Sequence, residues 1–244
     1  MLSKVHSATL LGLEAMVVTI EVDNFDGGQS SRFAIVGLPD NAVKESQERV
    51  QSALRVNGYK APFKSVVINL APADIRKEGT GFDLPMAIGV MLSFEFLQIE
   101  NPERFMFVGE LGLDGSILPV KGILPISIKA RELGYEALFV PAENAREAAV
   151  VNKLKVYAVN HLNDIVNFFN GSVPVEPTLV NTREEFYSQL FNFESDFSEV
   201  RGQENVKRAL EVAAAGGTAG MGIGTAFCTG GSRTAVGHQI MVRI

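Results

Sequence analysis

The amino-acid sequence predicts an α/β fold with a mixed (α+β) sheet, and three observations support this prediction. Two segments rich in β-branched and apolar residues, 4–11 and 14–22, come first and are joined by a tight turn at Gly12. Further short apolar segments then alternate with segments of helical period. The last of these ends near Asn170, and a proline-containing stretch follows it. We therefore expect one α/β domain over residues 1–171.

The first half of this domain is expected to contain two helices, each introduced by an aspartate. Asp40 follows a proline and has the side chain that accepts a hydrogen bond at a helix N-cap. Asp83 is interpreted in the same way, with Pro85 in the first turn, where proline is tolerated. The expected elements are strand 31–36, helix 42–56 with one apolar face, strand 65–70 and helix 83–96.

The second half is expected to begin with a hairpin and to continue with alternating helices and strands. Asp114-Gly115 is a strong short-range signal for a hairpin turn. Gly134 and Gly171 each follow an apolar periodic segment, as glycines at helix ends do. The expected elements are strands 106–113 and 116–119, helix 123–133, strand 137–140, helix 143–151, strand 155–159 and helix 162–169.

The chain beyond residue 171 has a different character. Pro174 and Pro177 lie in 172–198, which is interpreted as a linker with a short helix over 184–193. The segment 203–215 predicts an amphipathic helix. From Gly216 onward glycines are frequent and no acidic residue occurs, and we expect the tail 218–244 to be disordered rather than to extend the fold.

Composition narrows the function classes. The formal net charge of −6 over 244 residues argues against a chain that coats nucleic acid by itself. A single cysteine, Cys228, excludes an internal disulfide and a cysteine-rich metal site, which fits a reducing cytoplasm. No signal peptide or membrane-spanning segment is expected, and neither is a metal site, because His6, His161 and His238 lack ligand-spaced neighbours.

One loop before a predicted helix concentrates charged residues and is the candidate functional loop. It contains Asp74, Arg76, Lys77, Glu78 and Asp83, with glycines between them. Polar loops on rigid scaffolds often bind ligands, and helix N-termini attract anions. The plainer interpretation is that Asp83 only caps its helix while Arg76 and Glu78 pair in solvent. The residues alone leave both interpretations open.

Several segments, taken in order, resemble the N-terminal domain of the ComM/YifB family of Mg-chelatase-like AAA+ ATPases. They are VGLPDNAVKES (36–46), NLAPADIRKEGTGFDLP (69–85), VGELGLDG (108–115) and PVKG (119–122). The segment VRGQENVKRALEVAAAGG (200–217) resembles the opening of that family's ATPase module. The resemblance therefore implies the start of an ATPase module over 199–217.

The family's N-terminal domain is similar to the proteolytic domain of Lon, which implies positions for a serine–lysine pair. The match puts Gly81 at the serine position and Leu124 at the lysine position, while Lys121 is nearby on a different face. Glycine has no nucleophile and leucine accepts no proton, so the resemblance implies a non-proteolytic domain and no catalytic residue. The alternative is a hydrolase that uses Ser46 or Ser65 with a lysine from a rearranged site.

Full-length members of the family are ATPases that act on DNA, which the resemblance carries over as an expectation. They form hexamers that aid branch migration in natural transformation (competence), and they use ATP and Mg²⁺ held by a phosphate loop. This sequence contains no G-x-x-x-x-G-K-[ST], and 218–244 departs from the family. We expect a truncated chain that binds no cofactor, is inactive alone and serves protein interaction only.

Overall fold

The computed structural model describes residues 2–26, 32–60, 64–172, 176–180 and 202–215. The chain divides into two compact units, Met1–Asn181 and Thr182–Ile244. The first unit contains the sheet and the candidate loop. Among the described residues, no helix has the length and apolar character needed to cross a membrane.

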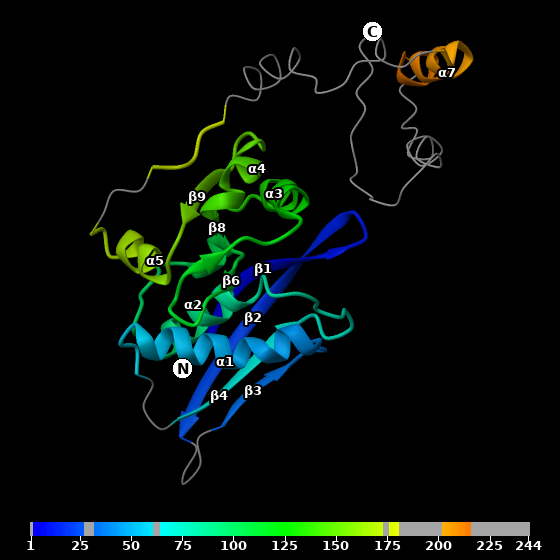
Figure 1. The fold of residues 1–244 in the computed structure, drawn as a ribbon. Helices are drawn as coiled ribbons and strands as arrows, with labels where there is room; N and C mark the ends of the chain where they lie inside the picture. The colour runs from blue at the N-terminus through cyan, green and yellow to red at the C-terminus, as the bar shows by residue number, and fades with distance from the viewer. Residues whose placement is uncertain (1, 27–31, 61–63, 173–175, 181–201, 216–244) are drawn as a thin grey trace. The chain divides into compact units, whose positions relative to one another are not determined.

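A seven-stranded sheet, in the order β3-β4-β2-β1-β5-β8-β9, organises the first unit (Figure 1). The pairings of β2 with β1 and with β4 are antiparallel, and the remaining four pairings are parallel. The predicted mixed α/β sheet is confirmed. The strands are β1 (Ser3–Leu11), β2 (Glu14–Asp26), β3 (Phe33–Val36), β4 (Lys64–Ala71), β5 (Phe105–Phe107), β8 (Ala137–Pro141) and β9 (Lys155–Val159).

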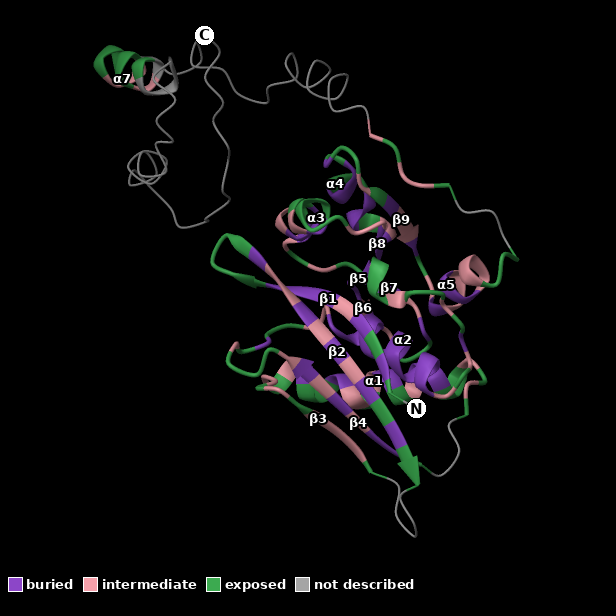
Figure 2. Cartoon of the chain, turned by 180° about the vertical axis from the view of Figure 1, so that it is seen from behind, coloured by how far each residue is buried: buried purple, intermediate pink, exposed green. Residues whose placement is uncertain are grey.

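Helices pack against both faces of the sheet because apolar side chains of β1 and β2 alternate between two cores. Val5 and Ile20 lie in a core with residues of α1, α2 and α5. Ala8 and Ala15 lie in a second core with residues of α3 and α4. Every residue of α2 is buried, as Figure 2 shows. The helices are α1 (Asn41–Val56), α2 (Asp83–Ser93), α3 (Ile123–Glu132), α4 (Ala145–Ala149) and α5 (Leu162–Phe169).

The expected long strand over 106–113 is wrong. The chain forms β5 in the main sheet and then a separate short strand, β6 (Glu110–Leu111), which pairs with β7 (Ile117–Leu118). Between them the backbone turns toward the start of α2, where Gly109 donates to the Gly81 carbonyl and accepts from Leu84, both at 3.0 Å. The segment therefore connects the sheet to the candidate loop.

Most other predicted elements are confirmed, with shifted ends. Strand 155–159 and helix 162–169 are found as predicted, whereas helix 83–96 ends at Ser93. The predicted helix 143–151 is a 3-10 turn, Ala142–Asn144, followed by α4, and another 3-10 turn, Pro102–Arg104, precedes β5.

In the second unit, the predicted helix 203–215 is found as α7 (Glu204–Ala215). The predicted helix 184–193 and the tail 218–244 lie outside the described residues.

Candidate functional site

Lys77 of the candidate loop is a buried structural residue. Its side chain is fully buried, and its ammonium donates to the backbone carbonyls of Pro72 and Ile75, the latter at 2.7 Å. Burial lowers the pKa of Lys77. Its backbone also bonds to Leu38 and Asp40, which joins the loop to the segment before α1. Lys77 therefore closes the loop and is unavailable to a ligand.

The prediction that Asp83 caps α2 is wrong. Asp83 is the first residue of the helix, Phe82 holds the cap position, and no side-chain cap hydrogen bond is present. Its carboxylate instead accepts from Arg49, with Nε at 2.5 Å and Nη2 at 3.0 Å, and from the Leu111 backbone N–H at 3.2 Å. Asp83 therefore joins α2 to α1 and β6.

Burial of the Asp83 carboxylate and its pairing with Arg49 have opposite effects on its pKa. Asp83 is fully buried, and the loss of hydration raises its pKa, while the hydrogen bond from Arg49 opposes that rise. The same hydrogen bond raises the pKa of the Arg49 guanidinium. The bidentate geometry favours the charged pair. By contrast, Asp40 caps α1 as predicted, accepting from Val43 N at 2.7 Å.

The remaining charged residues of the loop face solvent. Arg76 and Glu78 form an ion pair at 3.3 Å, and their side chains are 70% and 66% exposed. Asp74 is exposed as well. The plainer interpretation of Arg76 and Glu78, a pair in solvent, is confirmed. The candidate loop thus separates into a buried part, Lys77 and Asp83, and an exposed part.

A cleft of about 640 Å³ lies beside the loop, at the carboxyl ends of the parallel strands β1 and β5. Ligands of open α/β sheets commonly bind at this edge. Gly81 lines the cleft, as does Lys121, whereas Leu124 is not among the lining residues. The lining residues are Ala8, Thr9, Leu10, Asp40, Glu78, Gly79, Thr80, Gly81, Phe82, Val108, Glu110, Pro119, Val120, Lys121 and Ile126.

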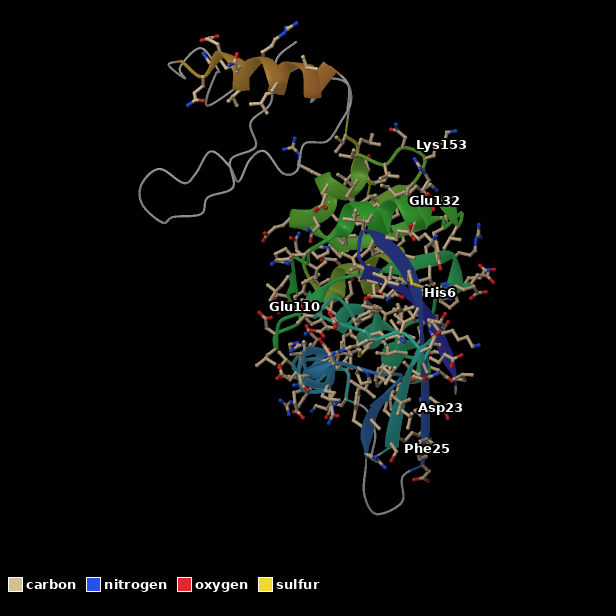
Figure 3. The ribbon with its side chains drawn as sticks, turned by 90° about the vertical axis from the view of Figure 1, so that its right-hand side faces the viewer. His6, Asp23, Phe25, Glu110, Glu132 and Lys153 are labelled. Carbon is tan, nitrogen blue, oxygen red and sulfur yellow. The ribbon has the colours of Figure 1, made fainter. Side chains whose placement is uncertain are left out.

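One polar pair in this cleft has no signal in the sequence. The hydroxyl of Thr80 donates to the carboxylate of Glu110, although the two residues are far apart in the sequence. Glu110 follows the turn after β5 and lies at the surface (Figure 3). The two residues come together because the chain returns to the start of α2 after β5. No fixed sequence spacing predicts such a contact.

The positions expected for a serine–lysine pair hold no such pair. Gly81 has no side chain, and Leu124, 37% exposed, uses its backbone N–H to bind Glu147 at 3.0 Å. Ser46 is fully buried and accepts from Arg49 at 3.2 Å. Ser65 is 3% exposed and accepts from the Arg32 backbone at 3.1 Å. Neither serine lines the cleft.

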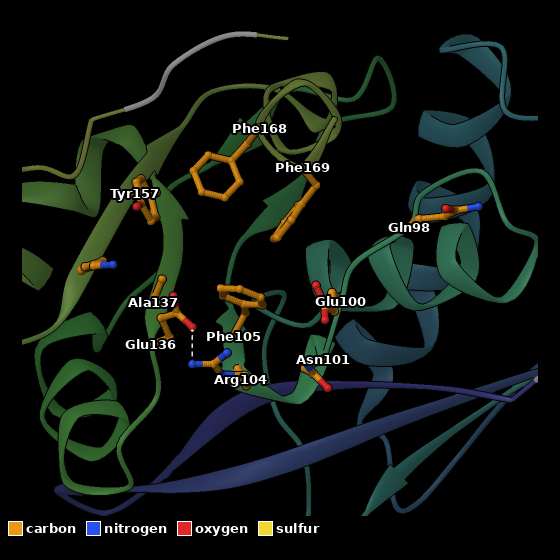
Figure 4. Close-up of a pocket in the computed structure, with 11 residues that line it drawn as sticks. Gln98, Glu100, Asn101, Arg104, Phe105, Glu136, Ala137, Tyr157, Phe168 and Phe169 are labelled. Atoms are coloured by element: carbon orange, nitrogen blue, oxygen red, sulfur yellow. Dashed lines mark ion pairs between the residues drawn. The ribbon is translucent and has the colours of Figure 1, made fainter. Parts of the chain in front are cut away.

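A second pocket, of about 420 Å³, lies at the amino ends of β8 and β9 (Figure 4). Aromatic rings line it and pack on one another, with Tyr157 and Phe168 at 4.6 Å and Phe105 and Phe169 at 5.3 Å between centroids. An ion pair between Arg104 and Glu136 at 2.8 Å lies at its rim. These contacts hold α5 on the sheet. Within the described ranges, no three His, Cys, Asp or Glu side chains gather around a metal-sized space.

The sequence matches the family model of subunit ChlI of Mg-chelatase over residues 20–144, which include the candidate loop and most of the cleft. The chain belongs to this family. It is 39% identical over 217 residues to the competence protein ComM of Haemophilus influenzae, covering 88% of this chain and 42% of that protein. It is 36% identical over 219 residues to the uncharacterized protein YifB of Escherichia coli, covering 88% and 41%.

The chain is more distantly similar to Lon proteases. It is 24% identical over 164 residues to the Lon protease of Finegoldia magna, covering 62% of this chain and 21% of that protein. The chain spans about two fifths of the length of its ComM and YifB relatives.

Proposed function

We propose that this chain forms the non-proteolytic N-terminal interaction domain of a ComM/YifB-type Mg-chelatase-like ATPase. The observation that supports this proposal is the cleft, which contains Gly81, the position that the Lon resemblance assigns to the serine. Gly81 stands at the serine position, and the hydroxyl groups among the lining residues belong to Thr9 and Thr80. The Thr80 hydroxyl donates its hydrogen bond to the carboxylate of Glu110 and not to a lysine base.

The ATP chemistry of the family is assigned to segments other than this domain. The sequence has no G-x-x-x-x-G-K-[ST], the motif that arranges backbone N–H groups and a lysine around the phosphates of ATP. Full-length members are expected to bind ATP and Mg²⁺ and to act as hexamers on DNA. For the 244-residue chain, titration with a fluorescent ATP analogue in Mg²⁺ should give no saturable binding, and micromolar binding would contradict the proposal.

Peptidase activity is tested directly with casein and small fluorogenic peptides. We expect no turnover above a buffer blank. If turnover occurs, alanine variants of Ser46, Ser65 and Thr80 identify its source. Turnover that one of these substitutions abolishes would show that the domain is a hydrolase with a rearranged site.

A further inference from the structure

We infer that the cleft beside Gly81 binds an extended basic segment of a partner protein. The inference rests on the proposed function, since it names the chemistry of the partner that this interaction domain holds. Three features of the cleft carry it: a glycine that the backbone does not require, an excess of carboxylates, and several apolar lining residues.

Gly81 is a glycine that the local backbone could replace. Its φ is not in the left-handed region, and an added Cβ would lie 3.4 Å from Val108 Cγ1 and 3.8 Å from Val120 Cγ1, which is ordinary contact. Gly79, two residues earlier, has φ +86° and does require glycine. The missing side chain at Gly81 therefore keeps the cleft floor open between two valines, where another backbone can approach closely.

Carboxylates dominate the charged side chains of the cleft. Asp40, Glu78 and Glu110 line it, against the single ammonium of Lys121. Each carboxylate offers about four lone-pair sites. Asp40 accepts two backbone N–H groups, and Glu110 accepts the Thr80 hydroxyl. The exposed pair of Glu78 with Arg76 contributes little and exchanges readily. The cleft therefore favours a cationic ligand.

Three helices, α1, α2 and α3, begin beside the cleft, and their N-terminal partial charges alone would favour an anion. Each N-terminus already has partners within the fold. The Asp40 carboxylate caps α1. The first backbone N–H groups of α2 donate to the carbonyls of Thr80 and Gly109, at 3.1 and 3.0 Å. The Glu147 carboxylate accepts the Leu124 backbone N–H at 3.0 Å at the start of α3. The carboxylates on the cleft wall consequently decide the sign of the preferred ligand charge.

Apolar side chains also line the cleft. They are Leu10, Phe82, Val108, Val120 and Ile126. Such residues pack against aliphatic side chains and against the methylene stems of lysine and arginine. Side chains of an extended peptide point alternately to opposite sides. A segment that alternates basic and aliphatic residues therefore offers both kinds of side chain that the lining of the cleft favours.

The test uses the full 244-residue chain and a fluorescently labelled peptide of alternating lysine and leucine, with a glutamate–leucine peptide as its counterpart. Fluorescence anisotropy should show saturable binding of the basic peptide only. Gly81→Met, which fills the floor, should weaken binding about tenfold, and Glu110→Gln about threefold. Glu48→Gln removes the same charge from the exposed face of α1 and should leave binding unchanged.

Circular dichroism and thermal unfolding establish whether each variant is folded. If Gly81→Met does not fold, Glu110→Gln still tests the cleft. Equal binding of both peptides, or binding indifferent to both cleft variants, would overturn the inference while leaving the proposed function intact. Mass spectrometry of the bound peptide separates the two further. An intact peptide supports both proposals, whereas a cleaved one keeps the basic-segment site and refutes the non-proteolytic function.

Discussion

The buried and exposed parts of the candidate loop differ in role although their residues alternate in the sequence. Arg76 and Glu78 flank Lys77, yet the two outer side chains face water and the middle one is fully buried. Lys77 forms an isolated parallel β-bridge with Pro39. In such extended backbone, successive side chains point to opposite sides. Charge density in a loop therefore does not identify its function. Lys77 and Asp83 hold the fold together, and Glu78 faces the cleft.

Asp83→Ala, in the buried part of the loop, should lower the free energy of unfolding by about 3 kcal/mol, more than any other substitution proposed for the loop. The change leaves Arg49, whose side chain is only 18% exposed, without its bidentate partner. Urea denaturation measures the loss. Glu78→Ala, the matched change in the exposed part, should cost less than about 0.5 kcal/mol. A cost near 1 kcal/mol for Asp83→Ala is the size of a lost helix cap and would contradict the ion-pair role.

Lys77→Met should lower the free energy of unfolding by about 2 kcal/mol, because the carbonyls of Pro72 and Ile75 lose a charged donor. Thermal unfolding measures this loss. The exposed Lys44→Met on α1 is the control and should be nearly neutral. Similar effects of the two substitutions would show that burial of Lys77 carries no structural role.

The same variant tests a pH dependence. Burial puts the pKa of Lys77 below its ordinary value of 10.5, so the unfolded chain binds more protons than the folded chain between these two values. Stability contributed by this group therefore rises with pH across that window. Lys77→Met should lack the rise when unfolding is followed over alkaline pH up to 10.5. An unchanged profile would contradict the lowered pKa.

Gly79→Ala and Gly81→Ala should have smaller effects on the free energy of unfolding. Alanine at position 79 must adopt φ +86° and should cost about 1 kcal/mol. Alanine at position 81 meets only ordinary contacts and should change the free energy of unfolding by less than about 0.5 kcal/mol. Chemical denaturation of both variants decides this. Equal costs would mean that Gly81 is required by the fold, which would weaken the case for a ligand-directed glycine.

The sequence predicted elements whose signals are local. Strand 155–159 and helix 162–169 have clear apolar periods and end signals, and both are found. The broken strand at Gly109 was missed because its cause is tertiary: the backbone leaves the sheet to bond with Gly81 and Leu84.

The candidate site shows the same limit. The resemblance assigns the serine position to Gly81 and the lysine position to Leu124; Gly81 lines the cleft and Leu124 does not. The pairs Thr80–Glu110 and Arg49–Asp83 were missed, since each joins segments 30 or 34 residues apart. An aspartate at a helix start satisfies the local rule for a cap equally well. Only the position of α1 beside α2 distinguishes an N-cap from a buried ion pair.

The smallest expected effect concerns the exposed ion pair itself. Arg76 and Glu78 are 70% and 66% exposed, so their attraction acts through water and is screened by salt. A double-mutant cycle with alanine at both positions should give a coupling of less than about 0.5 kcal/mol in unfolding. Arg76→Ala nevertheless releases the Glu78 carboxylate toward the cleft, and it should raise the affinity for the lysine–leucine peptide by about twofold. Unchanged or weaker peptide binding would show that Glu78 takes no part in recognition and would leave Asp40 and Glu110 as the carboxylates that recognise the peptide.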